Sequence, residues 1–446
     1  MQAIFSRFLN RQAFFQGSAI LAVTTLVSYA LGLLRDRIFA QTFGASSQLD
    51  AYNAAFTLPD LILNIFVAGA LTAAFVPIFS DLRDRAKKET IDDFISSVLN
   101  GSLIMVLATA VVVYFFAPVL SQLIIPGHDY ETQNLFVELT RILLLSPIIF
   151  SFSNTLGNIL LVRDRFFWYG LAAALYNVGI IGGTILLAPR YGIHGVAYGA
   201  IGGALLHFAT RWFGLRHFAF KYLFKIRFDQ YYKKFIRIML PKIIGHPVEQ
   251  FTFLGFTIIA SMISSGSIAI LNFARNFQSM PINTIGVTMA LASFPLLARA
   301  VSSRNATRFD NELKFTAKSI LAVTVPATVI IYFFSYWIIS FFLGGGAFDD
   351  RAIDLTATTL SLFAFSIPTE SLSHLLARGF YALKNSFIPV VVSIGSLAVS
   401  VATAYYLAKV YGVEGIPVAY FIGSCVKTLL LWVIIRLRVN DLQELS

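Results

Sequence analysis

The sequence predicts an all-α polytopic membrane protein with about twelve transmembrane helices, and three observations support this prediction. Of the 446 residues, 57% are hydrophobic and only 13% are charged, whereas soluble domains carry roughly a quarter charged residues. The mean hydropathy is +0.74. Apolar runs such as 101–119, 171–187, 320–343 and 390–408 reach the ~20 residues that a helix needs to cross a bilayer. They are not the short alternating segments of an outer-membrane barrel.

Charge clusters and turn residues divide the chain into twelve predicted spans. In order, these are 17–39, 51–80, 94–125, 134–161, 166–188, 194–216, 239–263, 266–298, 319–343, 354–377, 385–408 and 415–435. We expect the first span to be retained as a helix, because no clear small-residue cleavage site follows it. Prolines inside the spans predict kinks, which are tolerated where a helix lines a cavity; they stand at 59, 147, 247, 281, 326 and 368.

Positive charge sets the predicted orientation. Lysines and arginines concentrate in alternate loops, with nine of them between Arg211 and Lys242. By the positive-inside rule these loops and both termini face the cytoplasm, and the number of helices is even. The net charge of +11 is therefore a topology signal. We expect no nucleic-acid partner, because the cations do not gather on one folded face.

Two sequence matches at nearly one offset predict an internal duplication. Residues 190–196 (RYGIHGV) reappear as 410–416 (VYGVEGI), an offset of 220. Residues 49–59 match 271–281 at nearly the same offset, and a second proline follows each. Six helices per copy give both copies the same orientation. The predicted pseudo-twofold axis therefore runs along the membrane normal, as in rocking transporters with a central cavity.

This duplication predicts an N-terminal six-helix lobe at 1–217 and a C-terminal six-helix lobe at 239–446. Between them, 218–238 is predicted to be a cytoplasmic basic amphipathic linker. Residues 221–237 (KYLFKIRFDQYYKKFIR) mix aromatic and cationic side chains at helical spacing. We expect this segment to lie as a helix on the cytoplasmic lipid headgroups.

No catalytic motif is recognised in the sequence. A GxxxxGK[ST] phosphate loop, HExxH, CxxC and a nucleophile elbow are all absent, and the six histidines are scattered. The single cysteine, Cys425, excludes an intrachain disulfide. We therefore expect a protein that is not an enzyme, with no catalytic residue, metal site or organic cofactor. Transport driven by an ion gradient or by the membrane potential is the remaining function class.

Ionisable residues inside the apolar spans are the candidate functional positions, because each costs about 2.5–3.5 kcal/mol at a helix centre on insertion scales. Arg35 and Arg275 are candidate substrate contacts, since a guanidinium binds phosphate through paired hydrogen bonds and stays charged. For Arg35 the alternative is an ion pair with Asp36 near the outer membrane face. Polar residues expected to line the same cavity are Asp36, Asp50, Asn53, Asp60, Asn64 and Asn276. Asp50 has the alternative role of a helix N-cap.

Three further residues are candidates for ion coupling. Glu249 follows a proline in the seventh span, and Glu370 and His374 form an i, i+4 pair in the tenth. Binding of a coupling ion, Na⁺ or H⁺, is one interpretation. The other is hydrogen bonding between helices.

The opening of the chain resembles the MurJ (MviN) lipid II flippases, which belong to the multidrug/oligosaccharidyl-lipid/polysaccharide exporter superfamily, also called MOP, together with the MATE transporters. The matching motifs, in order and spacing, are LGLLRD at 31–36, FGA at 43–45, DA at 50–51, AF at 55–56, LP at 58–59, GA at 69–70 and AFVP at 74–77. Weaker similarity extends over essentially the whole chain.

This resemblance implies two six-helix lobes that alternate access to a cationic cavity in the bacterial inner membrane. The implied cargo is lipid II, an undecaprenyl-diphosphate-linked glycan used in cell-wall synthesis, moved from the cytoplasmic to the outer leaflet. Membrane lipids and cell-wall synthesis proteins are the implied partners. The diphosphate-sugar head cannot cross hydrocarbon unaided, whereas the lipid tail can remain in the bilayer.

Several positions depart from the family pattern. Tyr29 stands where the family has an arginine after the helix-one serine, and Leu63 and Asn64 replace paired arginines of helix two. The helix-eight arginine position holds Asn276, with Arg275 one residue earlier, about 100° around an ideal helix. Only Arg35 is retained, so we expect a less cationic cavity. Export of another lipid-linked oligosaccharide or of an amphipathic cation, and a non-transporting scaffold of envelope assembly, remain alternatives.

Overall fold

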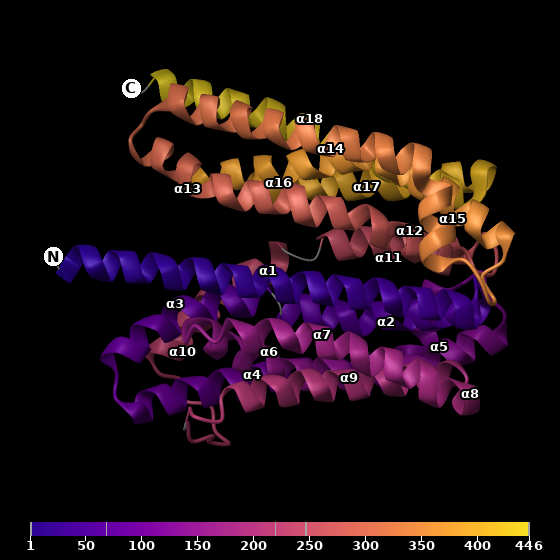
Figure 1. Ribbon diagram of the computed structural model, residues 1–446, viewed down its shortest axis with the longest axis horizontal. Helices are drawn as coiled ribbons and strands as arrows, with labels where there is room; N and C mark the ends of the chain where they lie inside the picture. The colour runs from indigo at the N-terminus through magenta and orange to yellow at the C-terminus, as the bar shows by residue number, and fades with distance from the viewer. Residues whose placement is uncertain (1, 68, 219, 246–247, 445–446) are drawn as a thin grey trace. The chain divides into compact units, whose positions relative to one another are not determined.

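The chain folds into α-helices joined by short turns, π-helical segments and one 3-10 turn (Figure 1). The computed structural model describes residues 2–67, 69–218, 220–245 and 248–444; Pro247, one of the predicted kink positions, lies outside these ranges. Within the described residues no β-strand forms, and one isolated bridge joins Gly345 and Phe348. The predicted all-α class is confirmed.

Two compact units make up the chain. Unit 1 comprises residues 1–39, 54–122 and 129–247, and unit 2 comprises 40–53, 123–128 and 248–446. Helices α1 (Gln2–Phe43) and α2 (Ser47–Phe66) each contribute to both units. The structure therefore groups two short segments of the first sequence half with the second half. The predicted lobe boundaries at 217 and 239 rest on the sequence repeat and stay a prediction.

Unit 1 is a bundle of long helices that run side by side (Figure 1). Besides parts of α1 and α2 it contains α3 (Gly69–Arg85), α4 (Lys88–Ile124), α5 (Tyr130–Leu143), α6 (Leu145–Val162), α7 (Phe166–Gly182), η1 (Gly183–Leu187), α8 (Ala188–Tyr191), α9 (Ile193–Gly214) and α10 (Gln230–Gly245).

An aromatic core joins α3, α4 and α10 in unit 1. The Phe75 ring stacks on Phe79 and Phe94, with centroids 5.2 and 5.4 Å apart. Phe235 of α10 meets Phe94 edge-on at 6.3 Å. All four rings are buried. Such stacked and edge-on ring pairs stabilise the core beyond what the burial of apolar surface contributes. They hold α10 against α3 and α4.

Glycines bring α7 and α9 into backbone contact. A Cβ atom added to Gly179 would lie 2.2 Å from the Gly203 Cα, and one added to Gly183 would lie 2.3 Å from the Gly199 Cα. Gly179 lies in α7 and Gly183, four residues later, begins η1, and they face Gly203 and Gly199 of α9, which are also four residues apart. This is the small-xxx-small pattern that lets membrane helices approach closely. The two helices therefore pack tightly because neither carries a side chain at the crossing.

Unit 2 is the second helical bundle. Besides 40–53 and 123–128 it contains α11 (Val248–Ser261), α12 (Ser267–Pro281), η2 (Ile282–Val287), α13 (Thr288–Ser302), α14 (Ala306–Leu343), α15 (Asp350–Ala364), α16 (Ser366–Ala382), α17 (Phe387–Tyr411), η3 (Gly412–Glu414) and α18 (Gly415–Glu444). One core cluster joins α13, α14, α16 and α18 around Phe309, Phe380 and Ile435, each fully buried.

Local structure repeats at the predicted offset of 220 residues. Gly192 has φ 55° and ψ −140°, and Gly412 has φ 61° and ψ −144°. Both start the tight turn into the next helix, in a region of backbone conformation that favours glycine. Asp129 caps α5 by accepting from the Thr132 amide, and Asp349 caps α15 in the same way from the Ala352 amide. The two halves are thus built from corresponding elements.

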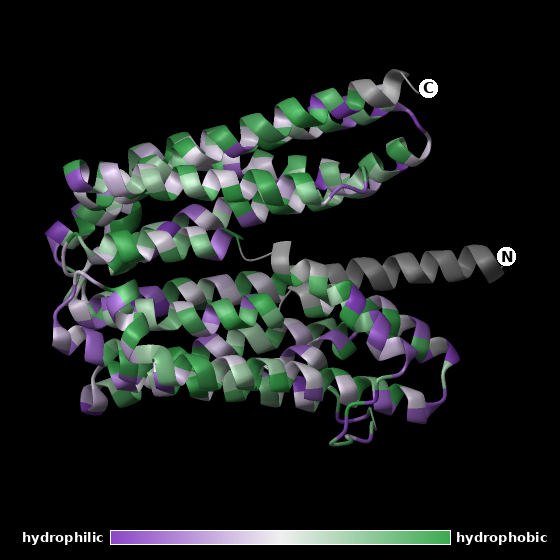
Figure 2. Ribbon diagram, turned by 180° about the vertical axis from the view of Figure 1, so that it is seen from behind, coloured by the Kyte–Doolittle hydropathy of each residue, from purple (hydrophilic) through white to green (hydrophobic). Residues whose placement is uncertain are grey.

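The helices are long and apolar enough for membrane crossing. By length and composition, eight helical stretches of the described residues qualify, or nine if α15 and α16, which meet at 42°, form one span. Helices occur at all twelve predicted spans, but α9 and the shorter α11 are not among those that qualify, and α17 and α18 qualify as one stretch. The count of twelve stays a prediction. Figure 2 shows hydrophobic residues along the helices and hydrophilic residues gathered at turns.

The linker differs from the predicted helix. Residues 220–229 form an irregular loop, and α10 begins only at Gln230. The physical reason lies in α4, whose Ser96, Ser97 and Asn100 side chains bond to the backbone of this loop. Side-chain partners of this kind replace the hydrogen bonds that a helix would supply to the backbone. The helical interpretation was therefore wrong for 221–229.

Candidate functional site

A polar cavity lies inside unit 2 and collects five of the predicted site residues. Its volume is about 270 Å³. Five elements supply its lining: α11, α12, η2, α16 and α18. The lining residues are Glu249, Phe253, Arg275, Asn276, Gln278, Ser279, Ile282, Asn283, Glu370, His374 and Tyr420. Candidates for substrate binding and for ion coupling therefore share one site.

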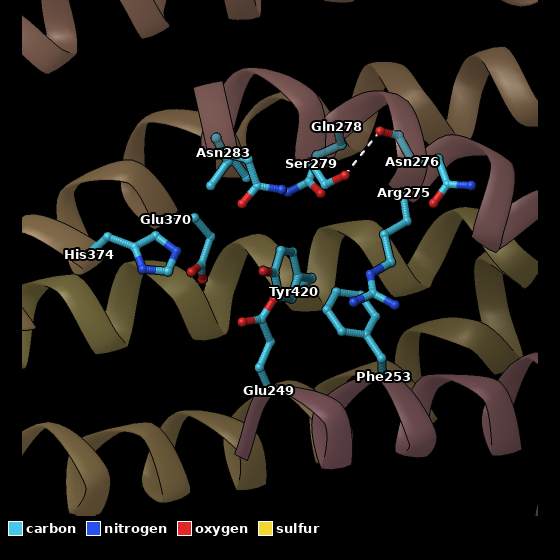
Figure 3. A pocket seen from close by; sticks show the side chains of 11 residues that line it. Glu249, Phe253, Arg275, Asn276, Gln278, Ser279, Asn283, Glu370, His374 and Tyr420 are labelled. Atoms are coloured by element: carbon cyan, nitrogen blue, oxygen red, sulfur yellow. Dashed lines mark hydrogen bonds between the residues drawn. The ribbon is translucent and has the colours of Figure 1, made fainter. Parts of the chain in front are cut away.

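Arg275 is positioned by an aromatic ring. Its guanidinium carbon lies 3.3 Å from the centroid of the Phe253 ring, well within cation–π range. Phe253 is buried on α11 and packs against Tyr420, with centroids 5.4 Å apart. One face of the guanidinium is thus covered by the ring. Figure 3 shows Arg275 beside Phe253 and close to Asn276.

Glu370 is a buried carboxylate with a fixed cationic partner. Its side chain is 5% exposed, and Lys427 of α18 places Nζ 2.7 Å from Oε2. The Ser373 hydroxyl also donates to Oε2, at 3.3 Å. Removing one partner of a buried pair leaves an uncompensated charge and is strongly unfavourable. The two charges of this pair therefore depend on each other at the cavity wall.

Two more ionisable side chains face the same space. Figure 3 shows the Glu249 carboxylate and the Glu370 carboxylate both pointing toward the ring of Tyr420. His374 lies one helical turn after Glu370 on α16. With histidine neutral, Glu249 and Glu370 balance the charges of Arg275 and Lys427. The cavity is therefore polar and charged without a large excess of either sign.

The predicted helix-one candidates form a different group, in unit 1. Arg35 pairs with Asp36 at 2.8 Å, and its other nitrogen donates to Asn177 Oδ1 of α7 at 3.2 Å. Asp36 is buried, whereas the Arg35 side chain is 25% exposed. The ion pair expected as the alternative for Arg35 is therefore present. It leaves part of the guanidinium accessible.

Asp50 caps a helix, but not its own. Its carboxylate accepts from the amides of Gly266 and Ala269 at the start of α12, both at 2.7 Å. His128 Nε2 lies 3.4 Å from the same carboxylate. Asp50 is fully buried, and all four residues belong to unit 2. The N-cap alternative for Asp50 thus describes its contacts, with the partner helix 216 residues away.

The remaining candidates lie on α2. Asn53 belongs to unit 2, and Asp60 and Asn64 belong to unit 1. All three are partly exposed, and the Asn64 amide donates to the Asp60 carbonyl one turn earlier. Their assignment as cavity residues stays a prediction.

Sequence reasoning missed part of the cavity. Tyr420 and Phe253 are aromatic residues in apolar helices, and no local signal distinguishes them from core positions. Lys427 did have a signal, because it is a lysine inside the last apolar run, and charged residues there merit the same attention as Arg275. Among the described residues, no cluster of three or more His, Cys, Asp or Glu side chains is arranged to hold a metal ion.

These features define a class of protein. Long apolar helices in two units, with ionisable side chains around a cavity inside one of them, are the construction of a multi-pass membrane transporter. A solved MATE transporter of the MOP superfamily, in an inward-facing conformation, shares this fold with a TM-score of 0.79 and 18% identity, covering 96% of this chain and 99% of its own.

The sequence then identifies the family. The family model described as lipid II flippase MurJ matches residues 39–445. The lipid II flippase MurJ of Thermosipho africanus is 30% identical over 434 residues, or 96% of this chain and 87% of the relative. That of Burkholderia cenocepacia is 26% identical over 438 residues, covering 94% and 84%. A solved lipid II flippase MurJ in an inward closed conformation has a TM-score of 0.82 and 27% identity, covering 94% and 87%. The chain belongs to the MurJ lipid II flippase family, a family of bacterial multi-pass membrane transporters.

Proposed function

We propose that this protein is a lipid II flippase that acts by alternating access. Membership of the MurJ family over residues 39–445 carries this proposal. The chemistry of the cargo agrees with the site. A diphosphate needs a cation that stays charged, and the Arg275 guanidinium lines a cavity among apolar helices. The sugars need hydrogen-bonding groups, which Asn276, Ser279 and Asn283 supply along the same wall.

In this proposal Arg275 and Asn276 contact the diphosphate-sugar head. Arg35, Asn53, Asp60 and Asn64, which are partly exposed, are further proposed contacts of the head group. The buried Asp36 and Asp50 have supporting roles instead, because Asp36 pairs with Arg35 and Asp50 caps α12. The protein is placed in the bacterial inner membrane with both termini in the cytoplasm, because Lys and Arg concentrate in the corresponding loops.

We further propose that a cation, Na⁺ or H⁺, couples to transport at Glu249, Glu370 and His374. Two carboxylates on α11 and α16 face one cavity, and Lys427 already neutralises one of them. A bound cation would offset the other when Arg275 engages the diphosphate. Glu249→Gln should then remove the dependence of flipping on the ion gradient, whereas a purely structural role would leave that dependence unchanged.

Complementation of a bacterium depleted of its own MurJ tests the main proposal. Growth would be scored together with the accessibility of lipid II at the outer leaflet. Rescue is the expected result. Failure with normal membrane expression and topology would refute lipid II as the cargo and favour another lipid-linked oligosaccharide or the scaffold role.

Arg275→Ala tests the binding site within this proposal. We expect loss of rescue and partial retention in Arg275→Lys, which keeps the charge but not the planar donor edge. Arg351→Ala is the matched control, since Arg351 is an exposed arginine at the start of α15 in the same unit. Equal rescue by Arg275→Ala and Arg351→Ala would refute a role for the Arg275 guanidinium.

The two carboxylates also favour a second candidate, export of an amphipathic cation. A cation would bind between Glu249 and Glu370 and stack on Tyr420. Efflux of a fluorescent lipophilic cation from cells that express the chain, abolished by Glu249→Gln, would support this function.

A further inference from the structure

An exposed cationic and aromatic loop follows α9 in unit 1. Between residues 216 and 237 the chain has seven lysines and arginines and one acidic residue, Asp229. All seven cationic side chains are exposed; they are Arg216, Lys221, Lys225, Arg227, Lys233, Lys234 and Arg237. Phe224 is 88% exposed and Phe228 is 69% exposed. Exposed aromatic rings next to lysines and arginines are typical of a surface that meets lipid headgroups.

The loop is held in one conformation by buried polar side chains of α4. The Asn100 amide donates to the carbonyls of Leu223 and Lys225, at 2.8 and 2.9 Å. The Ser96 hydroxyl accepts from the Leu223 amide and the Ser97 hydroxyl accepts from the Arg227 amide, at 3.0 and 2.9 Å. Ser96, Ser97 and Asn100 are at most 5% exposed.

These hydrogen bonds to α4 fix the outward direction of the Phe224 ring. Phe224 lies between two residues whose backbones are bonded to α4, so its exposure is built into the loop. The buried bonds alone would be explained by a structural role in covering the polar face of α4. That role does not account for the exposed rings or for the surplus of cations.

The cations keep charge available at the surface. Asp93 of α4 is 5% exposed and pairs with both Lys225 and Arg227. One carboxylate thus serves two cations, whose side chains remain 55% and 63% exposed. These two ion pairs order the loop and leave it with a net positive charge.

The depth of the loop matches that of lipid headgroups. Helix α4 has 37 residues, or about 55 Å at 1.5 Å per residue, whereas the hydrocarbon core of a bilayer is ~30 Å thick. The charged residues of α4 all lie in its first third, Lys88–Asn100, and a mainly apolar run follows. The loop attaches to Asp93 through Asn100, the part that lies beside the headgroups when the apolar run spans the core. Figure 1 shows the loop beside α4 at the edge of unit 1.

We propose that residues 221–228 form a preformed docking surface for anionic phospholipids of the cytoplasmic leaflet. Phe224 and Phe228 insert at the headgroup–acyl boundary, and Lys221, Lys225 and Arg227 contact lipid phosphates. Aromatic rings prefer this interface, and cations near an anionic leaflet are attracted to it. The partner is the membrane surface itself, so the proposal is independent of which head group the transporter moves.

Spin labelling of the full-length protein in liposomes tests this directly. The single native cysteine, Cys425, is replaced by serine, and a nitroxide is placed at Phe224→Cys. A matched label at Ser303→Cys reports an exposed turn between α13 and α14. In vesicles that contain phosphatidylglycerol, the label at 224 should be accessible to oxygen and protected from a water-soluble nickel chelate. Its ratio of oxygen accessibility to nickel accessibility should exceed that of the label at 303 by at least about threefold.

Two other outcomes would overturn the proposal. A label at 224 that is as accessible to nickel as the label at 303 would mean that the loop does not dock. A label equally protected in pure phosphatidylcholine would mean aromatic insertion without recognition of anionic lipid.

A second measurement does not depend on the label. Lys221→Gln with Phe224→Ser leaves the Asp93 pairs intact, so folding should be retained. Native mass spectrometry of protein from mixed-lipid nanodiscs should show at least about a threefold loss of retained phosphatidylglycerol relative to the unsubstituted protein. Arg308→Gln with Phe387→Ser, both exposed positions of unit 2, is the control. Equal retention in both variants would overturn the proposal.

Discussion

Replacement of Asp50 by alanine should destabilise unit 2 strongly. The Asp50 carboxylate is fully buried and accepts two backbone amides of α12 at 2.7 Å, with His128 at 3.4 Å. Alanine would leave both amides without an acceptor. A buried donor that loses its partner costs about 1–3 kcal/mol, so the two together cost about 2–6 kcal/mol. For a unit of this size that corresponds to a fall in the melting temperature of roughly 4 °C or more.

The protein contains both a labelling site for the unfolding assay and a position for a matched control variant. Cys425 is the single cysteine and is partly buried in α18 of unit 2, so a thiol-reactive fluorescent dye reports the opening of that unit on heating. Asp349→Ala is the matched control, because Asp349 caps α15 through one amide at 2.8 Å and is exposed. Loss of such a cap typically costs about 1 kcal/mol.

The comparison gives a clear ranking. Asp50→Ala should lower the melting temperature about twice as much as Asp349→Ala or more. Asp50→Asn should fall between Asp50→Ala and the unsubstituted protein, because its one carbonyl oxygen can satisfy one amide. A shift for Asp50→Ala no larger than that for Asp349→Ala would refute the reasoning that buried amides depend on Asp50.

Two further predictions concern packing and buried charge. Gly199→Val should lower the yield and melting temperature of the protein, because a Cβ there meets the Gly183 Cα of η1 at 2.7 Å. Gly202→Val should not, because no atom outside its own helix lies within 4 Å of a Cβ there. Equal behaviour of the two variants would contradict the direct packing of η1 on α9. Lys427→Met should destabilise unit 2 by about 3–5 kcal/mol because Glu370 is left buried without its cation, and adding Glu370→Gln should restore most of that loss in thermal unfolding. Additive effects of the two substitutions would contradict the ion pair.

The membrane fold followed from sequence because its signals are local. Hydropathy and loop charge need only neighbouring residues, and they located helices at every predicted span. The duplication was visible at 190–196 and 410–416, and the same turn geometry occurs at Gly192 and Gly412. The bend between α15 and α16 also had a local signal, because Pro368, one of the predicted kink positions, stands three residues after the break at Phe365 and cannot donate a hydrogen bond to the Ala364 carbonyl.

The site was only partly predictable, because its partners are distant in sequence. The charged-residue criterion selected Glu249, Arg275, Glu370 and His374, and the structure places these four around one cavity. It could not select Tyr420, whose role depends on the helices packed against it. The helical spacing of 221–229 was misleading, because Ser96, Ser97 and Asn100, more than 120 residues earlier, compete for the same backbone groups.

The capping of α12 by Asp50 has a consequence for biogenesis. Asp50 is synthesised 216 residues before Gly266, an interval of roughly 10–40 s at ordinary translation rates. During that interval the carboxylate cannot have its final partners, so the newly inserted first half stays in the membrane with Asp50 not yet capping α12. A chaperone or the insertion machinery has a window there in which to act. If the chain were cut between the two halves, unit 2 could form only when both fragments were present.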